Sequence, residues 1–231
     1  KLYGSRAMLY ETARFVEIYK DYTHLSHDRK LTPEERAEMK TYTRLADAFT
    51  PMLKLMSSEY CNSLAYDAIQ IFGGSGYMKD YPIERIYRDA RITNIYEGTS
   101  QLQVVAAIRH VTTGTYLAQI KEYEAQTYEQ KHLHEKLVAL REEYEQSVQK
   151  VVSAENNEFI DFHARRMVEM AAHIIISYLL MRQAGEVEDY RNSAELYVKY
   201  AEAQNSAAAR YIESSTLADL DLISAVKEEE L

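Results

Sequence analysis

The placement of glycine and proline constrains the fold of this chain more than any other feature. Six of the seven glycines and all three prolines lie within residues 1–114, and after Gly114 only Gly185 follows. Both residue types interrupt helices, because glycine costs backbone entropy and proline lacks an N–H donor. Residues 115–231 therefore have few places to turn sharply, and long helices are expected there.

Apolar residues recur with a period of 3.6 along most of the chain, and no segment alternates with a period of two, so the predicted fold class is all-α. Thr32-Pro33-Glu34-Glu35 is a typical helix start, and it predicts a helix to Phe72 with a kink at Pro51. Ser100 to Gln103 has the spacing of a capping box that opens another helix. The other expected helices are a first one carrying Met8, Phe15, Val16 and Tyr19, a short one from Asp80 to Ala90, and four at 115–150, 154–184, 187–212 and 216–226.

The charge changes at the same point as the glycine content. Residues 1–114 carry 15 Lys and Arg against 14 Asp and Glu, whereas residues 115–231 carry 12 against 22. We therefore expect two domains, a helical bundle at 1–114 and a second helical domain at 115–231. Phe159, Phe162, Met167, Met170 and the run 174–180 are expected to form the core of the second domain.

Composition also excludes several classes of function. The single cysteine, Cys61, cannot form an internal disulfide, and it is expected as a packed thiol on a helix. The longest apolar run, 173–181, is shorter than the ~20 residues that cross a bilayer. The net charge of −10 on residues 115–231 disfavours nucleic acid and anionic lipid as partners. No metal site is predicted.

Two irregular segments stand out in the first domain. One is Gln70-Ile71-Phe72-Gly73-Gly74-Ser75-Gly76-Tyr77, where a predicted helix ends in glycines. The other runs from Arg88 to Gln101 and contains Ile95-Tyr96-Glu97-Gly98-Thr99-Ser100-Gln101. Taken separately, a glycine pair is an ordinary helix C-cap, and a glutamate before a helix is an ordinary solvated residue.

Taken together and in order, the two segments resemble the acyl-CoA dehydrogenase family between about Leu45 and Gly114. The resemblance implies that Glu97 removes the α-proton of an acyl-CoA thioester while a hydride passes to N5 of FAD. A carboxylate suits that step, since a base of this kind must be close to the substrate and shielded from water. Gly98 would contact the substrate beside a backbone N–H that binds the thioester oxygen.

The resemblance also implies a flavin site shared between subunits, and hence a homodimer or larger assembly. Thr99, Ser100 and Gln101 match residues that contact the flavin at a helix start, where free N–H groups favour an anion. The segment that would reach the FAD of the neighbouring subunit comprises Gln70, Ile71, Phe72, Gly73 and Gly74.

The family's N-terminal helical domain and middle β-domain have no counterpart in these 231 residues, so the chain is expected to be an inactive piece of a longer enzyme. Residues 115–231 are expected to lie beyond the usual end of the family and resemble the extension of its very-long-chain subclass. The expected electron acceptor is an electron-transfer flavoprotein. The alternatives are an acyl-CoA oxidase of the same fold and a non-catalytic helical interaction module. The expected location is the bacterial cytoplasm or the mitochondrial matrix.

Overall fold

The computed structural model describes residues 1–222, and over this range it contains helices and no strand, which confirms the all-α prediction. By contacts the chain divides into two compact units, Lys1–Ala107 and Ile108–Leu231, and the division falls within α5. The helices are α1 (Leu2–Asp28), α2 (Pro33–Phe72), α3 (Gly74–Tyr77), α4 (Ile83–Ile92), α5 (Ser100–Thr112), α6 (Thr115–Glu124), α7 (Lys131–Ser153), α8 (Asn157–Glu186) and α9 (Tyr190–Ser214).

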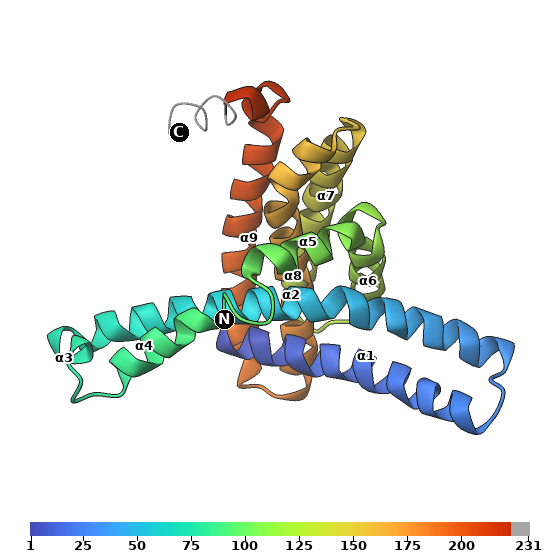
Figure 1. The fold of residues 1–231 in the computed structure, drawn as a ribbon, viewed down its shortest axis with the longest axis horizontal. Helices are drawn as coiled ribbons and strands as arrows, with labels where there is room; N and C mark the ends of the chain where they lie inside the picture. The colour runs from blue at the N-terminus through green and yellow to red at the C-terminus, as the bar shows by residue number, and fades with distance from the viewer. Residues whose placement is uncertain (223–231) are drawn as a thin grey trace. The chain divides into compact units, whose positions relative to one another are not determined.

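The first unit is built on a hairpin of α1 and α2, which lie side by side in Figure 1. Phe15 of α1 meets Phe49 of α2 edge to face at 4.9 Å, and both side chains are buried. Such aromatic pairs add to the stabilisation from apolar burial alone. α2 stays one helix through Pro51, so this unit has a single long rod to which its other elements attach.

The start of α2 has the predicted form. The Thr32 hydroxyl accepts a hydrogen bond from the Glu35 amide at 3.2 Å, and the Glu35 carboxylate accepts one from the Thr32 amide at 2.8 Å. This is a reciprocal capping box. Hydrogen bonds from Arg29 and from the Thr32 backbone lower the pKa of Glu35 to about 2.

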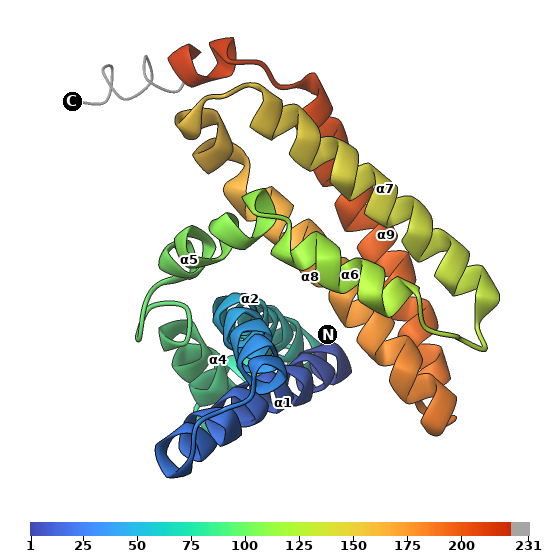
Figure 2. The same cartoon turned by 90° about the vertical axis from the view of Figure 1, so that its right-hand side faces the viewer.

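The second unit is a bundle of α6, α7, α8 and α9, seen from the side in Figure 2. Residues 174–180 of α8 are all buried, because helices α6, α7 and α9 each pack against α8. Phe159, Met167 and Met170 are buried as predicted, whereas Phe162 is only partly buried.

The predicted helix at 115–150 is wrong, because the structure divides it into α6 and α7 at residues 125–130. No glycine or proline marks the break, and side chains cap the end of α6 instead. The Tyr128 hydroxyl donates to the Tyr123 carbonyl oxygen at 2.9 Å, and His134 Nε2 lies 2.9 Å from the backbone carbonyl oxygen of Glu124. The Tyr128 ring also stacks on the His134 ring. These contacts satisfy carbonyls that a continuing helix would have used.

His163 is a polar residue buried in the interior of the second unit. It is 0% exposed, and neither ring nitrogen has a hydrogen-bond partner among the described residues. Three aromatic rings meet it edge to face: Phe159 at 4.6 Å, Phe162 at 4.7 Å and Tyr211 at 6.1 Å. Burial, followed by repulsion from Arg166 and Lys150, lowers the pKa of His163 from 6.5 to about 4.

Two smaller expectations also differ from the structure. Cys61 on α2 is exposed rather than packed. The helix expected at 216–226 is seen at residues 218–222, and its remainder lies outside the described residues. Among the described helices, none is long and apolar enough to cross a membrane.

Candidate functional site

The loop between α4 and α5 has the most unusual backbone in the first unit. Glu97 has a φ of +51° and Gly98 a φ of +91°, so two successive residues have positive φ. A non-glycine residue in this region costs on the order of 1 kcal/mol or more and persists only where its surroundings hold it. Any other residue at Gly98 would be strained by the φ of +91°, and an added Cβ would also displace the Gln103 side-chain nitrogen, which would lie 2.7 Å away.

Two side chains tie this loop to the helices on either side. Lys54 of α2 donates from Nζ to the carbonyl oxygens of Thr93 at 2.8 Å and Gly98 at 2.7 Å. Gln103 of α5 donates from Nε2 to the carbonyl oxygens of Glu97 at 3.3 Å and Gly98 at 3.2 Å. The loop is therefore held by side chains at its beginning and at its end.

A second polar cluster lies beneath the same loop. The Glu59 carboxylate accepts hydrogen bonds from Asn94 and from the Ser100 hydroxyl, each at 2.7 Å. Asn62 donates to the Asn94 side chain and to the Ala90 carbonyl, the latter at 2.9 Å. Partly buried polar groups that satisfy one another in this way restrict a loop to a single arrangement.

Lys54, Glu59, Asn62 and Asn94 have no predicted role in the sequence, and Gln103 is expected there only as part of a capping box. A signal was present, because Lys54, Ser58 and Asn62 recur every four residues on the side of α2 that faces the loop. Polar residues at helical spacing are most often solvated, however, and only the position of the loop shows what they hold.

Glu97 itself is exposed in this structure. Within the described residues, the structure records no hydrogen bond from the backbone N–H of Glu97 or of Gly98. The loop therefore presents a carboxylate next to unpaired backbone donors. A carboxylate can accept a proton, and backbone N–H groups can stabilise an oxygen on which negative charge develops.

The three residues after Gly98 form the start of α5. Thr99 and Gln101 are exposed, whereas Ser100 is buried and its hydroxyl is engaged with Glu59. The expected capping box at Ser100 is replaced by a cap one residue earlier, in which the Thr99 hydroxyl accepts from the Leu102 amide at 3.3 Å. The change has a clear cause: Ser100 already donates its hydroxyl to α2.

The predicted flavin-reaching segment, Gln70 to Gly74, lies at the far end of α2 (Figure 1). All five residues are exposed, and the Ile71 side chain is 84% exposed. Gly73 ends the helix with a φ of +61°. At 1.5 Å per residue, Gln70 is about 24 Å along α2 from Lys54 and about 12 Å from Asn62, the first and last α2 residues that hold the Glu97 loop. The structure thus places one predicted site segment at the C-terminal end of α2 and the other in a loop that is held by residues further back along the same helix.

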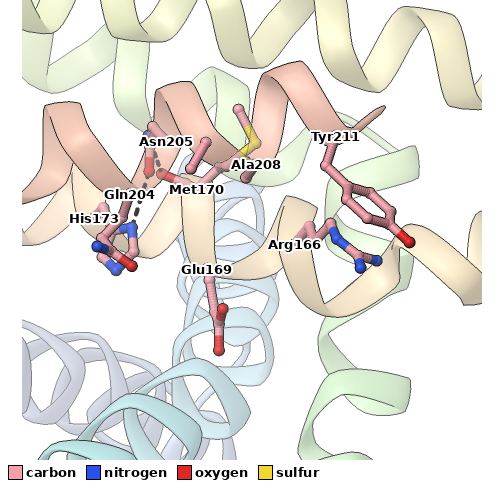
Figure 3. Close-up of a pocket in the computed structure, with 9 residues that line it drawn as sticks. Arg166, Glu169, Met170, His173, Gln204, Asn205, Ala208 and Tyr211 are labelled. Atoms are coloured by element: carbon pink, nitrogen blue, oxygen red, sulfur yellow. Dashed lines mark hydrogen bonds between the residues drawn. The ribbon is translucent and has the colours of Figure 1, made fainter. Parts of the chain in front are cut away.

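The second unit contains a pocket of about 270 Å³ between α8 and α9 (Figure 3). At one end the Arg166 guanidinium lies 3.8 Å from the centre of the Tyr211 ring. At the other end Nδ1 of the buried His173 contacts Asn205 Oδ1 at 2.8 Å, and Asn205 donates to the Met170 carbonyl at 3.1 Å. These contacts join the two helices of the pocket's walls.

Two family models match the chain next to each other. Residues 29–112 match the model described as acyl-CoA dehydrogenase, C-terminal domain, and residues 112–220 match the model described as acyl-CoA dehydrogenase C terminal. Each helical region is therefore similar to a C-terminal part of acyl-CoA dehydrogenases, and the second region matches a family model of its own. The chain belongs to the acyl-CoA dehydrogenase family.

Individual relatives resemble shorter parts of the chain. It is 48% identical over 64 residues to an acyl-CoA dehydrogenase of Bacillus subtilis, which covers 28% of this chain and 17% of that protein. It is 56% identical over 52 residues to subunit CarC of the caffeyl-CoA reductase-Etf complex of Acetobacterium woodii, covering 22% of this chain and 14% of that protein. The match thus spans less than a fifth of the length of either relative.

The fold also recurs among solved structures. The structure of an acyl-CoA dehydrogenase complexed with FAD from Bacillus anthracis superposes with a TM-score of 0.64 at 18% identity. The superposition covers 96% of this chain and 42% of that one. At this identity the likeness is one of fold, and it extends across both helical units.

Proposed function

We propose that the protein containing this chain catalyses the α,β-dehydrogenation of an acyl-CoA thioester, with Glu97 as the base that removes the α-proton. The observation that carries this proposal is the conformation of Glu97 and Gly98, two successive residues of positive φ held by side chains from α2 and α5. Backbone strain of this kind clusters at functional sites, and it persists only where the surrounding structure holds it, as Lys54 and Gln103 do here.

The chemistry follows from the groups on the loop. Loss of the α-proton places negative charge on the thioester oxygen, and the unpaired N–H groups of Glu97 and Gly98 are suitable donors to that oxygen. FAD, when bound, supplies the hydride acceptor at N5. The exposed Glu97 carboxylate would be shielded from water by the substrate and by parts of the enzyme that are not in this chain.

The same residues fit a role in holding FAD. Thr99 and Gln101 are exposed at the start of α5, where a helix favours an anionic or hydrogen-bonding group. Ser100 would contribute by fixing its neighbours, because its hydroxyl and its backbone N–H are already bonded to Glu59 and Asn94. The residues of the other segment, Gln70, Ile71, Phe72, Gly73 and Gly74, are exposed and open to a ligand.

We further propose that the active form is at least a homodimer. Gln70–Gly74 begins about 12 Å along α2 beyond Asn62, the last residue of that helix that holds the Glu97 loop, and this separation supports a role at a second flavin rather than at the one beside Glu97. Exposed apolar side chains surround that segment, including Ile71, Tyr77 at 81% exposure and Met78. A patch of this kind is typical of a surface that another subunit covers.

The proposed electron acceptor is an electron-transfer flavoprotein, which is consistent with the name of the A. woodii relative. We also propose that residues 1–114 and 115–231 act as the two domains, and that the second resembles the extension of the very-long-chain subclass. The compartment would be the cytoplasm of a bacterium or the mitochondrial matrix.

The test is anaerobic reduction of the flavin in the full-length protein. Acyl-CoA should bleach FAD in the wild-type protein and fail to do so in Glu97→Gln, while FAD stays bound in both. Normal bleaching in Glu97→Gln would remove Glu97 from the proposed role. Peroxide release under air would favour the oxidase, and bound acyl-CoA without bleaching in the wild type would favour the non-catalytic module.

A further inference from the structure

Lys54 makes three contacts with the Glu97 loop from a single ammonium group. Its Nζ lies 2.8 Å from the Thr93 carbonyl oxygen, 2.7 Å from the Gly98 carbonyl oxygen and 5.6 Å from the centre of the Tyr96 ring. Thr93 begins the loop and Gly98 follows Glu97 directly. One side chain of α2 therefore bridges both ends of the segment that carries the proposed base.

Holding Lys54 in this arrangement costs more free energy than leaving a lysine exposed on the surface. The side chain is half-buried, so its charge has lost part of its water shell, and holding the long side chain in one rotamer costs conformational entropy. Carbonyl oxygens and an aromatic face replace that water, and hydrogen bonds from a charged donor are the strong ones. The contacts thus hold the loop in a conformation that Glu97 would not adopt alone.

The bond to Gly98 also has an electronic consequence. The Gly98 carbonyl belongs to the same peptide unit as the N–H of Thr99, and an ammonium bonded to the oxygen polarises that unit. Gln103 acts similarly on the Glu97 carbonyl, whose peptide unit contains the N–H of Gly98. The Lys54 bond therefore strengthens the N–H of Thr99 as a donor, and the Gln103 bond strengthens the N–H of Gly98.

We propose that Lys54 is a positioning residue for the reaction: it holds the loop that carries Glu97 in one conformation and strengthens the adjacent N–H of Thr99, without itself touching the substrate. This inference rests on the proposed function. It requires that the loss of Lys54 slow the proton-abstraction step in protein that still folds and binds FAD.

The experiment is stopped-flow flavin reduction by acyl-CoA in the full-length, FAD-loaded protein. Lys54→Met keeps an unbranched side chain that is one atom shorter and removes the donor. A displacement of about 1 Å at a reacting group can cost about 10²-fold in rate, so a fall of that order in the reduction rate constant is expected. The amplitude reports how much flavin is in competent protein, and a purely structural role would lower the amplitude and leave the rate constant unchanged.

Two further variants complete the design. Lys40→Met changes an exposed lysine of the same helix and should reduce flavin at the wild-type rate. Lys54→Arg keeps a charged donor and should recover most of the rate lost in Lys54→Met. An increased isotope effect with α-deuterated acyl-CoA in Lys54→Met is also expected, because proton abstraction would then limit reduction.

The outcomes separate the two claims. If the wild type bleaches and Lys54→Met reduces its flavin at the wild-type rate, the inference about Lys54 is wrong and the proposed function stands. If the wild type does not bleach, the proposed function itself fails. Should Lys54→Met give no folded protein, Lys54→Gln replaces it, since a shorter neutral amide must also slow reduction; a wild-type rate in that variant refutes the inference.

Discussion

Replacing His163 with phenylalanine is expected to stabilise the second unit and to remove much of its sensitivity to mild acid. The wild-type imidazole is fully buried among Phe159, Phe162 and Tyr211, and its two nitrogens have no hydrogen-bond partner among the described residues. An unsatisfied buried polar group costs about 1–3 kcal/mol. A phenyl ring suits the same aromatic surroundings, so a gain of about 1 kcal/mol is expected at pH 7.

The pH dependence follows from the pKa of His163, which falls from 6.5 to about 4 on folding. Below pH 6.5 the unfolded chain binds a proton that the folded chain excludes, so stability is lost as the pH falls toward 4. One pKa unit corresponds to 1.36 kcal/mol, so the whole effect is about 3 kcal/mol. About 2 kcal/mol of this should be lost already between pH 7 and pH 5.

The assay is urea unfolding of wild type and His163→Phe at pH 7 and pH 5. Titration of carboxylates is common to both proteins, so the difference between their losses isolates His163. The free energy of unfolding of the wild type should fall by about 2 kcal/mol more than that of the variant over this pH range. His24→Phe, at an exposed position, is the matched control. If the free energy of unfolding falls equally in wild type and His163→Phe between pH 7 and pH 5, the imidazole is not kept neutral by burial.

Three more predictions concern the loops and the exposed surface. Gly98→Ala should destabilise the first unit by about 1–2 kcal/mol in urea unfolding and slow flavin reduction in the full-length protein, because of the φ of +91° and the contact with Gln103; an unchanged rate would contradict the loop's role. Tyr128→Phe removes the bond to the Tyr123 carbonyl and should cost about 1 kcal/mol, with faster hydrogen exchange at residues 125–130; unchanged exchange would show that the stacked rings alone hold the turn. Ile71→Lys should weaken self-association of the full-length protein in sedimentation experiments without lowering its helix content; an unaltered mass would place the subunit contact elsewhere.

The class of fold and the order of the helices were predictable, because glycine, proline and the apolar period report directly on local backbone preference. The break between α6 and α7 was not predictable from the sequence. Tyr128 and His134 end the helix, and their rings pack on Tyr178, which is distant in sequence. The shift of the cap from Ser100 to Thr99 has the same origin: a hydroxyl that could cap a helix locally is bonded to Glu59, 41 residues away.

In the candidate site, too, some features were predictable from the sequence and others depend on contacts between distant residues. The motif around Glu97 could be recognised only because it and the Gln70 segment occur in an order that resembles a known family; Glu97 alone is an ordinary acid at a helix start. The residues that hold the loop could not be predicted from the sequence. Lys54 and Glu59 have the pattern of solvated helix residues, and only the folded position of the loop shows that they bind it.

The length of α2 has a consequence for how such chains can change over time. The anchor of the Glu97 loop and the exposed segment after Gln70 are carried by one uninterrupted helix, with no loop between them to absorb an insertion. A single residue added between Glu59 and Gln70 would advance the far end by 1.5 Å and rotate it by about 100°, which would point Ile71 and Phe72 toward another side of the molecule. The number of residues in that interval is therefore as much a part of the site as the identity of any side chain, and substitutions there should be tolerated where deletions are not.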